Sequence, residues 1–143
     1  MAIWQVSLEL ITDTTLSFSE PTFSESVQKL AEVFPEEKSW CAFIKQYGNI
    51  DSTCIEISLK DSVVENISLR LGLLNLSRQD LHSLCEFAIA NNMYIKYRNT
   101  LYPPQVDSFK KIVIQSEAHK FLSNPHKYLD SINNELKESD SSV

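Results

Sequence analysis

"TCIEISLKDSVVENISLRLGL", residues 53–73, carries two alternating hydrophobic patterns joined by a short connection. Apolar residues recur at every second position; they are Ile55, Ile57 and Leu59 in the first half and Ile67, Leu69 and Leu71 in the second. A period of two is typical of strands that bury one face. Because the "DSVV" between them is short enough for a tight turn, the stretch predicts two strands paired as a hairpin.

Two further segments have the same strand character. Residues 3–11, "IWQVSLELI", alternate in the same way, and residues 93–99, "MYIKYRN", are expected to form a fourth strand. The alternation places polar side chains on one side of the strands; they are Gln5, Ser7, Glu9, Glu56, Ser58, Ser68, Arg70 and Lys96. We expect this polar face to be either exposed to water or covered by C-terminal helices.

Helical spacing appears after the first strand. One apolar stripe follows a cap at Ser24 or Thr22 and consists of Phe23, Val27, Leu30 and Phe34. Residues 35–48 predict a second helix, or the continuation of one helix bent at Pro35, that closes on Gly48. Its one largely aromatic side is made of Trp40, Phe43, Ile44 and Tyr47. That side is expected either to pack in the core or to leave an aromatic edge exposed as an interface anchor.

A further helix is predicted over residues 77–92. It begins with a capping box of Ser77 and Asp80 and stops at the pair Asn91 and Asn92. The strand pattern of residues 93–99 follows this helix directly.

The C-terminal quarter predicts a rigid extended segment, the exit from the fourth predicted strand, followed by helices. Residues 100–105, "TLYPPQ", are expected to be extended, because consecutive prolines cannot continue a helix or a ladder. A helix capped by Asp107 then runs to residue 122, and Asn124 with Pro125 caps a last short helix.

The order of these elements is strand, helix, strand, strand, helix, strand, and then helices. This order predicts an α+β fold, a ferredoxin-like split βαββαβ sandwich with extra C-terminal helices. Right-handed crossovers would place the helices between strands on one face of an antiparallel sheet. We expect a single α+β domain over residues 1–136 and a flexible polar tail over residues 137–143.

Composition and charge limit the partners. The chain has 143 residues and a net charge of -6. Its three cysteines are scattered, and the sequence shows no signal-peptide or membrane-spanning pattern. We therefore expect a cytoplasmic protein whose cysteines are reduced thiols. Residues 1–66 contain eleven acids and four lysines, a net charge of -7. This excess disfavours nucleic acid and suits a basic protein partner, although the acids could also serve only to keep the surface soluble.

Catalytic and metal-binding signatures are absent from the sequence. The two glycines, Gly48 and Gly72, belong to no phosphate-binding loop. His82 lies three residues from Cys85, but this cysteine falls on an apolar stripe where a thiol behaves as a small hydrophobe. We therefore predict no catalytic residue, no metal and no cofactor.

The closing segment "SEAHKFLSNPHKYLDSI", residues 116–132, resembles small cytoplasmic bacterial immunity proteins that neutralise contact-dependent or polymorphic toxins. The resemblance rests on the spacing of Ser116, Ala118, Phe121, Leu122, Asn124, Pro125, Tyr128 and Leu129. It implies a binding protein without catalytic activity whose partner is a toxin domain, with a nuclease as the first candidate.

Two functional hypotheses follow. In the first, acidic residues near residues 32–56 face a basic cleft of the toxin; they are Glu32, Glu36, Glu37, Asp51 and Glu56. In the second, the chain is a ferredoxin-like homo-oligomeric module that regulates a partner or binds a small ligand. The first predicts a monomer or a weak dimer.

Overall fold

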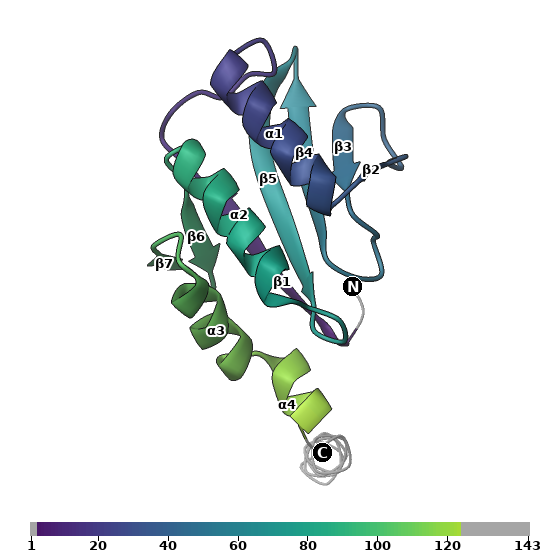
Figure 1. The fold of residues 1–143 in the computed structure, drawn as a ribbon, viewed down its shortest axis with the longest axis vertical. Helices are drawn as coiled ribbons and strands as arrows, with labels where there is room; N and C mark the ends of the chain where they lie inside the picture. Colours follow the sequence, from purple (N-terminus) through teal and green to yellow (C-terminus); the bar gives the residue numbers. More distant parts are fainter. Residues whose placement is uncertain (1–2, 124–143) are drawn as a thin grey trace, which may run out of the picture.

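The computed structural model describes residues 3–123, which form a mixed α+β fold with a seven-stranded antiparallel sheet and four helices (Figure 1). The strands are β1 (Gln5–Ile11), β2 (Glu36–Glu37), β3 (Ile44–Tyr47), β4 (Cys54–Lys60), β5 (Val63–Gly72), β6 (Tyr94–Tyr97) and β7 (Thr100–Tyr102). The helices are α1 (Pro21–Val33), α2 (Arg78–Ala90), α3 (Val106–Gln115) and α4 (Glu117–Ser123). Within the sheet the strand order is β2-β3-β4-β5-β1-β6-β7.

The predicted hairpin is confirmed as β4 and β5. Its turn residues Asp61 and Ser62 have φ angles of 51° and 68°, and Lys60 pairs with Val63. Positive φ at both central positions is the geometry of a two-residue turn that matches the twist of the flanking strands. The same solution recurs between β6 and β7, where Arg98 and Asn99 have φ angles of 48° and 65°.

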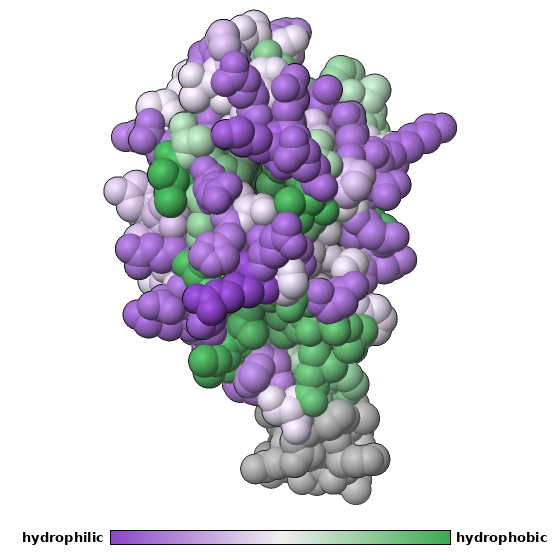
Figure 2. Space-filling model, in the orientation of Figure 1, coloured by the Kyte–Doolittle hydropathy of each residue, from purple (hydrophilic) through white to green (hydrophobic). Residues whose placement is uncertain are grey.

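The core lies between one face of the sheet and the helices. Helices α1 and α2 lie side by side across that face (Figure 1), and Phe109 and Ile112 bring α3 into the same core. The predicted apolar stripes of the strands are confirmed, since Leu8, Ile55 and Leu69 are all buried there. Viewed from this side, hydrophilic side chains cover much of α1 and α2, while hydrophobic ones gather toward α4 (Figure 2).

The other face of the sheet carries the predicted polar residues. Cross-strand partners share a face, and the register joins Ser7 to Arg70, Glu9 to both Ser68 and Lys96, and Glu56 to Ser68. Since α1, α2 and α3 all contribute to the core on the opposite side, none of these three covers this face. We call it the open face.

The predicted helix over residues 35–48 is wrong. This segment forms β2 and β3, with Glu36 paired to Tyr47 and Tyr47 paired to Ile55. The four-residue spacing of Phe43 and Tyr47 resembles a helical stripe, but pairing with the free edge of β4 satisfies the backbone and buries Tyr47 in the core. Tertiary pairing therefore overrides the local pattern.

The predicted limits of helices are confirmed in one case and corrected in another. The capping box of Ser77 and Asp80 is present, and α2 ends before Asn91, as predicted. Helix α1 instead begins at Pro21 after Glu20, which makes no side-chain capping bond, so neither Ser24 nor Thr22 is the cap. Proline suits the first position of a helix because its fixed φ is helical and no hydrogen bond is lost there.

The predicted rigid exit over residues 100–105 is partly wrong. Its first three residues form β7, because the tight turn at Arg98 and Asn99 folds the chain back onto β6, and Pro103 then follows the strand end.

The part of the chain that the structure describes includes no helix both long and apolar enough to cross a membrane.

The predicted continuous helix from Asp107 to residue 122 is interrupted at Ser116. The Ser116 hydroxyl donates to the Val113 carbonyl over 2.6 Å and accepts from the His119 amide over 3.2 Å. The serine therefore ends α3 and supports the start of α4, because serine side chains compete with the backbone for these bonds. The predicted helix after Pro125 and the predicted tail lie outside the described residues.

Candidate functional site

The most exposed large apolar side chains in the described residues belong to the loop between β2 and β3. Trp40 is 74% exposed and Phe43 is 69% exposed. Exposed aromatic residues on an otherwise polar surface are typical anchors of protein interfaces. The sequence leaves two predictions for this aromatic segment, packing in the core or an exposed aromatic edge. Trp40 and Phe43 form an exposed edge, whereas Tyr47 packs in the core.

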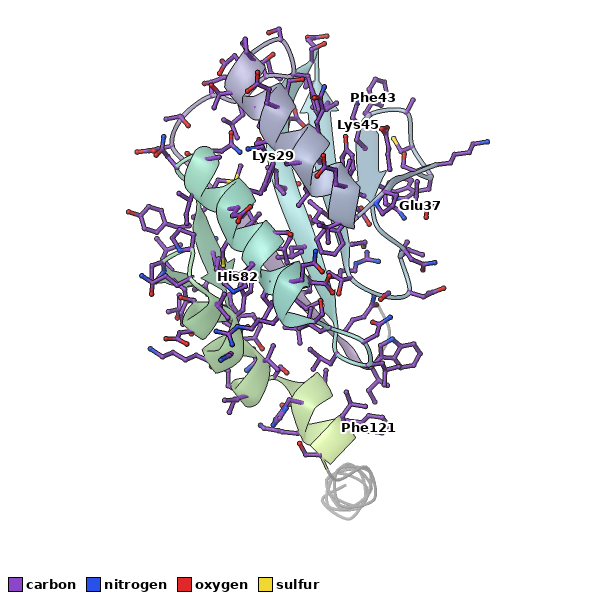
Figure 3. All side chains as sticks on the ribbon, viewed as in Figure 1. Lys29, Glu37, Phe43, Lys45, His82 and Phe121 are labelled. Carbon is purple, nitrogen blue, oxygen red and sulfur yellow. The ribbon has the colours of Figure 1, made fainter. Side chains whose placement is uncertain are left out.

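Acidic and polar residues surround these aromatics. We define the β2–β3 surface as Glu37, Lys38, Trp40, Phe43, Ile50 and Asp51, all exposed. In Figure 3, Glu37 and Phe43 lie at the same edge of the sheet, away from His82 on α2. The surface thus combines apolar anchors with carboxylates at one edge of the sheet.

Local hydrogen bonds shape the loop that carries Trp40. The Ser39 hydroxyl lies within hydrogen-bond distance of the carbonyl oxygens of Cys41 and Ile44 and donates its one proton to either, which closes the loop on itself. At the other end of the hairpin, the Gly48 amide donates to the Pro35 carbonyl over 2.9 Å. These bonds hold the exposed aromatics on a short, closed hairpin.

A second loop, residues 49–53, forms the other wall of the site. Its backbone is held by the first residue of β1 and the residue before it. The Gln5 side-chain nitrogen Nε2 donates to the carbonyls of Ile50 and Ser52 over 2.8 and 2.6 Å, and the Trp4 indole donates to the Asp51 carbonyl over 3.1 Å. These long-range bonds fix the backbone that presents the Asp51 carboxylate.

Both glycines of the chain serve this second loop. Gly48 has a φ of +84°, in the left-handed region, and a Cβ there would lie 2.3 Å from the Thr53 carbonyl oxygen. At Gly72, a Cβ would lie 2.7–3.0 Å from backbone atoms of Ser52. Glycine is required at both positions so that the loop can lie against the sheet.

Replacing Gly72 with alanine is expected to displace the loop and to lower the free energy of unfolding by about 1–3 kcal/mol, because the added methyl group meets backbone rather than a flexible side chain. Urea denaturation measures the loss, and the amide NMR shifts of Ile50 and Asp51 report the displacement. Leu74→Ala, at an exposed position close in sequence, is the control. Unchanged stability and unchanged shifts in Gly72→Ala would contradict the proposed close packing.

Between the two loops lies an open depression of about 420 Å³. The residues that line it include Glu37, Lys38, Trp40, Gln46, Ile50 and Asp51. Gln46 is only 5% exposed, and its amide nitrogen donates to the Gly48 carbonyl over 3.0 Å. Two acidic residues fourteen positions apart in the sequence, Glu37 and Asp51, thus line the same depression.

The five acids predicted to bind a partner do not form one cluster. Glu37 and Asp51 line the depression, whereas Glu32 lies on α1. Glu56 lies on the open face, mostly buried, 3.7 Å from the Arg70 guanidinium. Its Oε1 has no hydrogen bond among residues 3–123, so this carboxylate depends on Arg70 for compensation.

Glu36 lies beside a core tyrosine rather than in the depression. It pairs with Tyr47, and burial together with the Glu36 carboxylate raises the pKa of Tyr47 to about 12.

The sequence does not indicate that Lys38, Gln46 and Ile50 belong to the site, because no local pattern shows that the two loops lie side by side.

The remaining chemical candidates do not assemble. Burial and the neighbouring Glu86 raise the pKa of Cys85 to about 11, so its thiol is a poor source of thiolate near His82. Within residues 3–123, no three His, Cys, Asp or Glu side chains are grouped as a metal site. His119 lies 3.3 Å from the Ser123 hydroxyl, a contact between consecutive turns of α4.

At pH 8, one thiol is expected to react rapidly with iodoacetamide in the native protein. Cys41 lies half-buried in the β2–β3 loop, whereas Cys54 and Cys85 are buried. Mass spectrometry after timed labelling identifies the modified residue, and Cys41→Ser is expected to remove the rapid phase. Equal labelling rates at all three cysteines would contradict the burial of Cys54 and Cys85.

Stability is expected to decrease as the pH rises from about 9 to about 11. Burial raises the pKa of the Cys54 and Cys85 thiols from 9.0 to about 11. Over this range the unfolded chain has released protons that the native chain still binds, so a higher pH favours unfolding. Urea denaturation between pH 7 and 10 tests this, and the decrease should be smaller in Cys54→Ala/Cys85→Ala than in the unaltered chain.

Comparison of the chain with protein-family models, with curated proteins and with solved structures finds no match in any of the three.

Proposed function

We propose that this chain is a non-catalytic binding protein that holds a basic protein partner on the β2–β3 surface. The observation that carries the proposal is the 74% exposed Trp40 beside the carboxylates of Glu37 and Asp51, all lining one depression. An aromatic anchor supplies contact area, and the carboxylates favour encounter with a positive surface. The preorganised loops reduce the ordering cost of binding.

The partner proposed is a bacterial toxin domain, with a nuclease as the first candidate, and the chain acts as its cytoplasmic immunity protein. A nuclease that binds phosphates has a basic cleft, and a carboxylate-bearing surface could block it. The resemblance of residues 116–132 to immunity proteins and the charge of -7 over residues 1–66 support this choice.

The proposal includes a ferredoxin-like arrangement for the central part of the fold. Strands β4, β5, β1 and β6 are neighbours in that order and are antiparallel, and α1 and α2 follow β1 and β5 in the chain. In this arrangement β2 and β3 extend one edge of the sheet, and β7 extends the other. The proposed binding surface would therefore be an addition at one edge.

Co-precipitation with the toxin domain encoded beside the gene for this chain tests the proposal. Capture is expected at low salt, with weaker capture at moderate salt because charge pairs are screened. Glu37→Gln/Asp51→Asn should reduce capture, whereas Glu25→Gln/Glu86→Gln, which removes the same charge from α1 and α2, should not. Absence of a complex at both salt concentrations would overturn the proposal.

A homo-oligomeric or ligand-binding module is the second candidate. The open face favours it, because Tyr94 and Leu101 are 54% and 56% exposed there. Sedimentation velocity over a range of concentrations distinguishes the two, since a concentration-independent monomer would exclude oligomeric regulation.

A further inference from the structure

The residues that line the depression of the β2–β3 surface carry a net negative charge, with Glu37 and Asp51 against Lys38. Neither Glu37 nor Asp51 forms an ion pair with another residue of the described chain, although Lys38 also lines the depression. By contrast, Glu56 has Arg70 beside it, and Glu9 is the cross-strand partner of Lys96. Two carboxylates without an ion pair, against one lysine, favour a cation and repel an anion.

A buried amide adds a hydrogen-bond acceptor to the same lining. The Gln46 side-chain nitrogen donates to the Gly48 carbonyl, which orients the amide and leaves its Oε1 as the acceptor. Gln46 is 95% buried, lines the depression and is the cross-strand partner of Glu37, so this amide is a further acceptor beside that carboxylate. A bound group with N–H donors can donate to it.

The indole of Trp40 selects among cations. A guanidinium is planar, stacks on aromatic faces and presents five N–H donors, whereas an ammonium is a compact charge with three. The depression combines one aromatic face, two carboxylates and one amide oxygen. This set of groups matches a guanidinium better than an ammonium.

We infer that the depression receives an arginine side chain of the basic partner. The guanidinium stacks on Trp40 and donates hydrogen bonds to Glu37, Asp51 and the Gln46 Oε1, which replaces the hydration of both carboxylates by charge-assisted bonds. The inference rests on the proposed function and names the group that the β2–β3 surface recognises.

Titration of the ¹⁵N-labelled full chain with L-argininamide tests the inference without the partner. Saturable chemical-shift changes are expected at Glu37, Trp40, Gln46 and Asp51, with the changes elsewhere small. L-lysinamide, of equal charge, should bind several-fold more weakly, because it stacks poorly on the indole. Shifts spread evenly over all acidic residues, or equal affinity for the two amides, would overturn the inference.

Matched variants distinguish binding of L-argininamide at the depression from a general effect of the negative charge of the protein. Glu37→Gln/Asp51→Asn and Trp40→Ala should each weaken L-argininamide binding by about tenfold, whereas Glu25→Gln/Glu86→Gln should leave it unchanged. An equal loss in all three variants would also overturn the inference. If the toxin domain is captured but L-argininamide does not bind, the inference fails and the proposed function stands. If no complex forms with the toxin domain, the proposed function itself fails.

Discussion

Replacing Phe109 with alanine is expected to lower the free energy of unfolding by about 3–5 kcal/mol, because the ring is fully buried and its removal leaves a cavity. Phe109 projects from α3 into the core that α1, α2 and the sheet share. The same change should lower the melting temperature without moving the NMR shifts of the β2–β3 loop. Urea denaturation with a single cooperative transition gives the free energy.

The control for Phe109→Ala lies on the same helix. Ile114→Ala removes an apolar side chain that is 64% exposed, and its effect should stay within about 0.5 kcal/mol. Similar values for the two variants would show that α3 is not part of the cooperative core. A large loss in Phe109→Ala alone supports a domain that includes this C-terminal helix.

Replacing Trp40 with alanine is expected to weaken binding of the protein partner by about 30-fold or more, because truncation of an aromatic anchor commonly costs about 2 kcal/mol or more of binding free energy. The melting temperature should not change, since Trp40 lies outside the core. Isothermal titration calorimetry measures the affinity, and thermal denaturation confirms that the variant is folded.

Leu101→Ala is the matched control for Trp40→Ala. It removes an exposed apolar side chain from β7, at the opposite edge of the same sheet. If Leu101→Ala weakens binding and Trp40→Ala does not, the partner binds at the β7 edge and the β2–β3 surface is not the site.

The central sheet and most helices could be predicted because their patterns are local. Every second residue is apolar from Ile55 to Leu59 in β4 and from Ile67 to Leu71 in β5, and burial of one sheet face requires that period. The capping box of Ser77 and Asp80 fixes the start of α2 within four residues of sequence. Such signals do not depend on what the segment packs against.

The edge strands could not be predicted in this way. Glu36–Glu37 is too short to show a period, and Ile44–Tyr47 forms a strand because the edge of β4 is available to it. Likewise, no pattern near Glu37 indicates Asp51 as its neighbour, since hydrogen bonds from Trp4 and Gln5 bring that loop into place. The acidic residues could be identified from sequence, but their division between four locations could not.

The residues that support the site and the residues that face a partner are different sets. Gln5 and Gly72 hold the loop of Asp51 from the sheet, while Trp40 and Ile50 are exposed and contribute little to the core. Mutations at the exposed positions can therefore accumulate at small cost to stability. A lineage of such chains could diverge in partner specificity while the sheet stays constant, and the β2–β3 surface is suited to randomisation in a display library for the same reason.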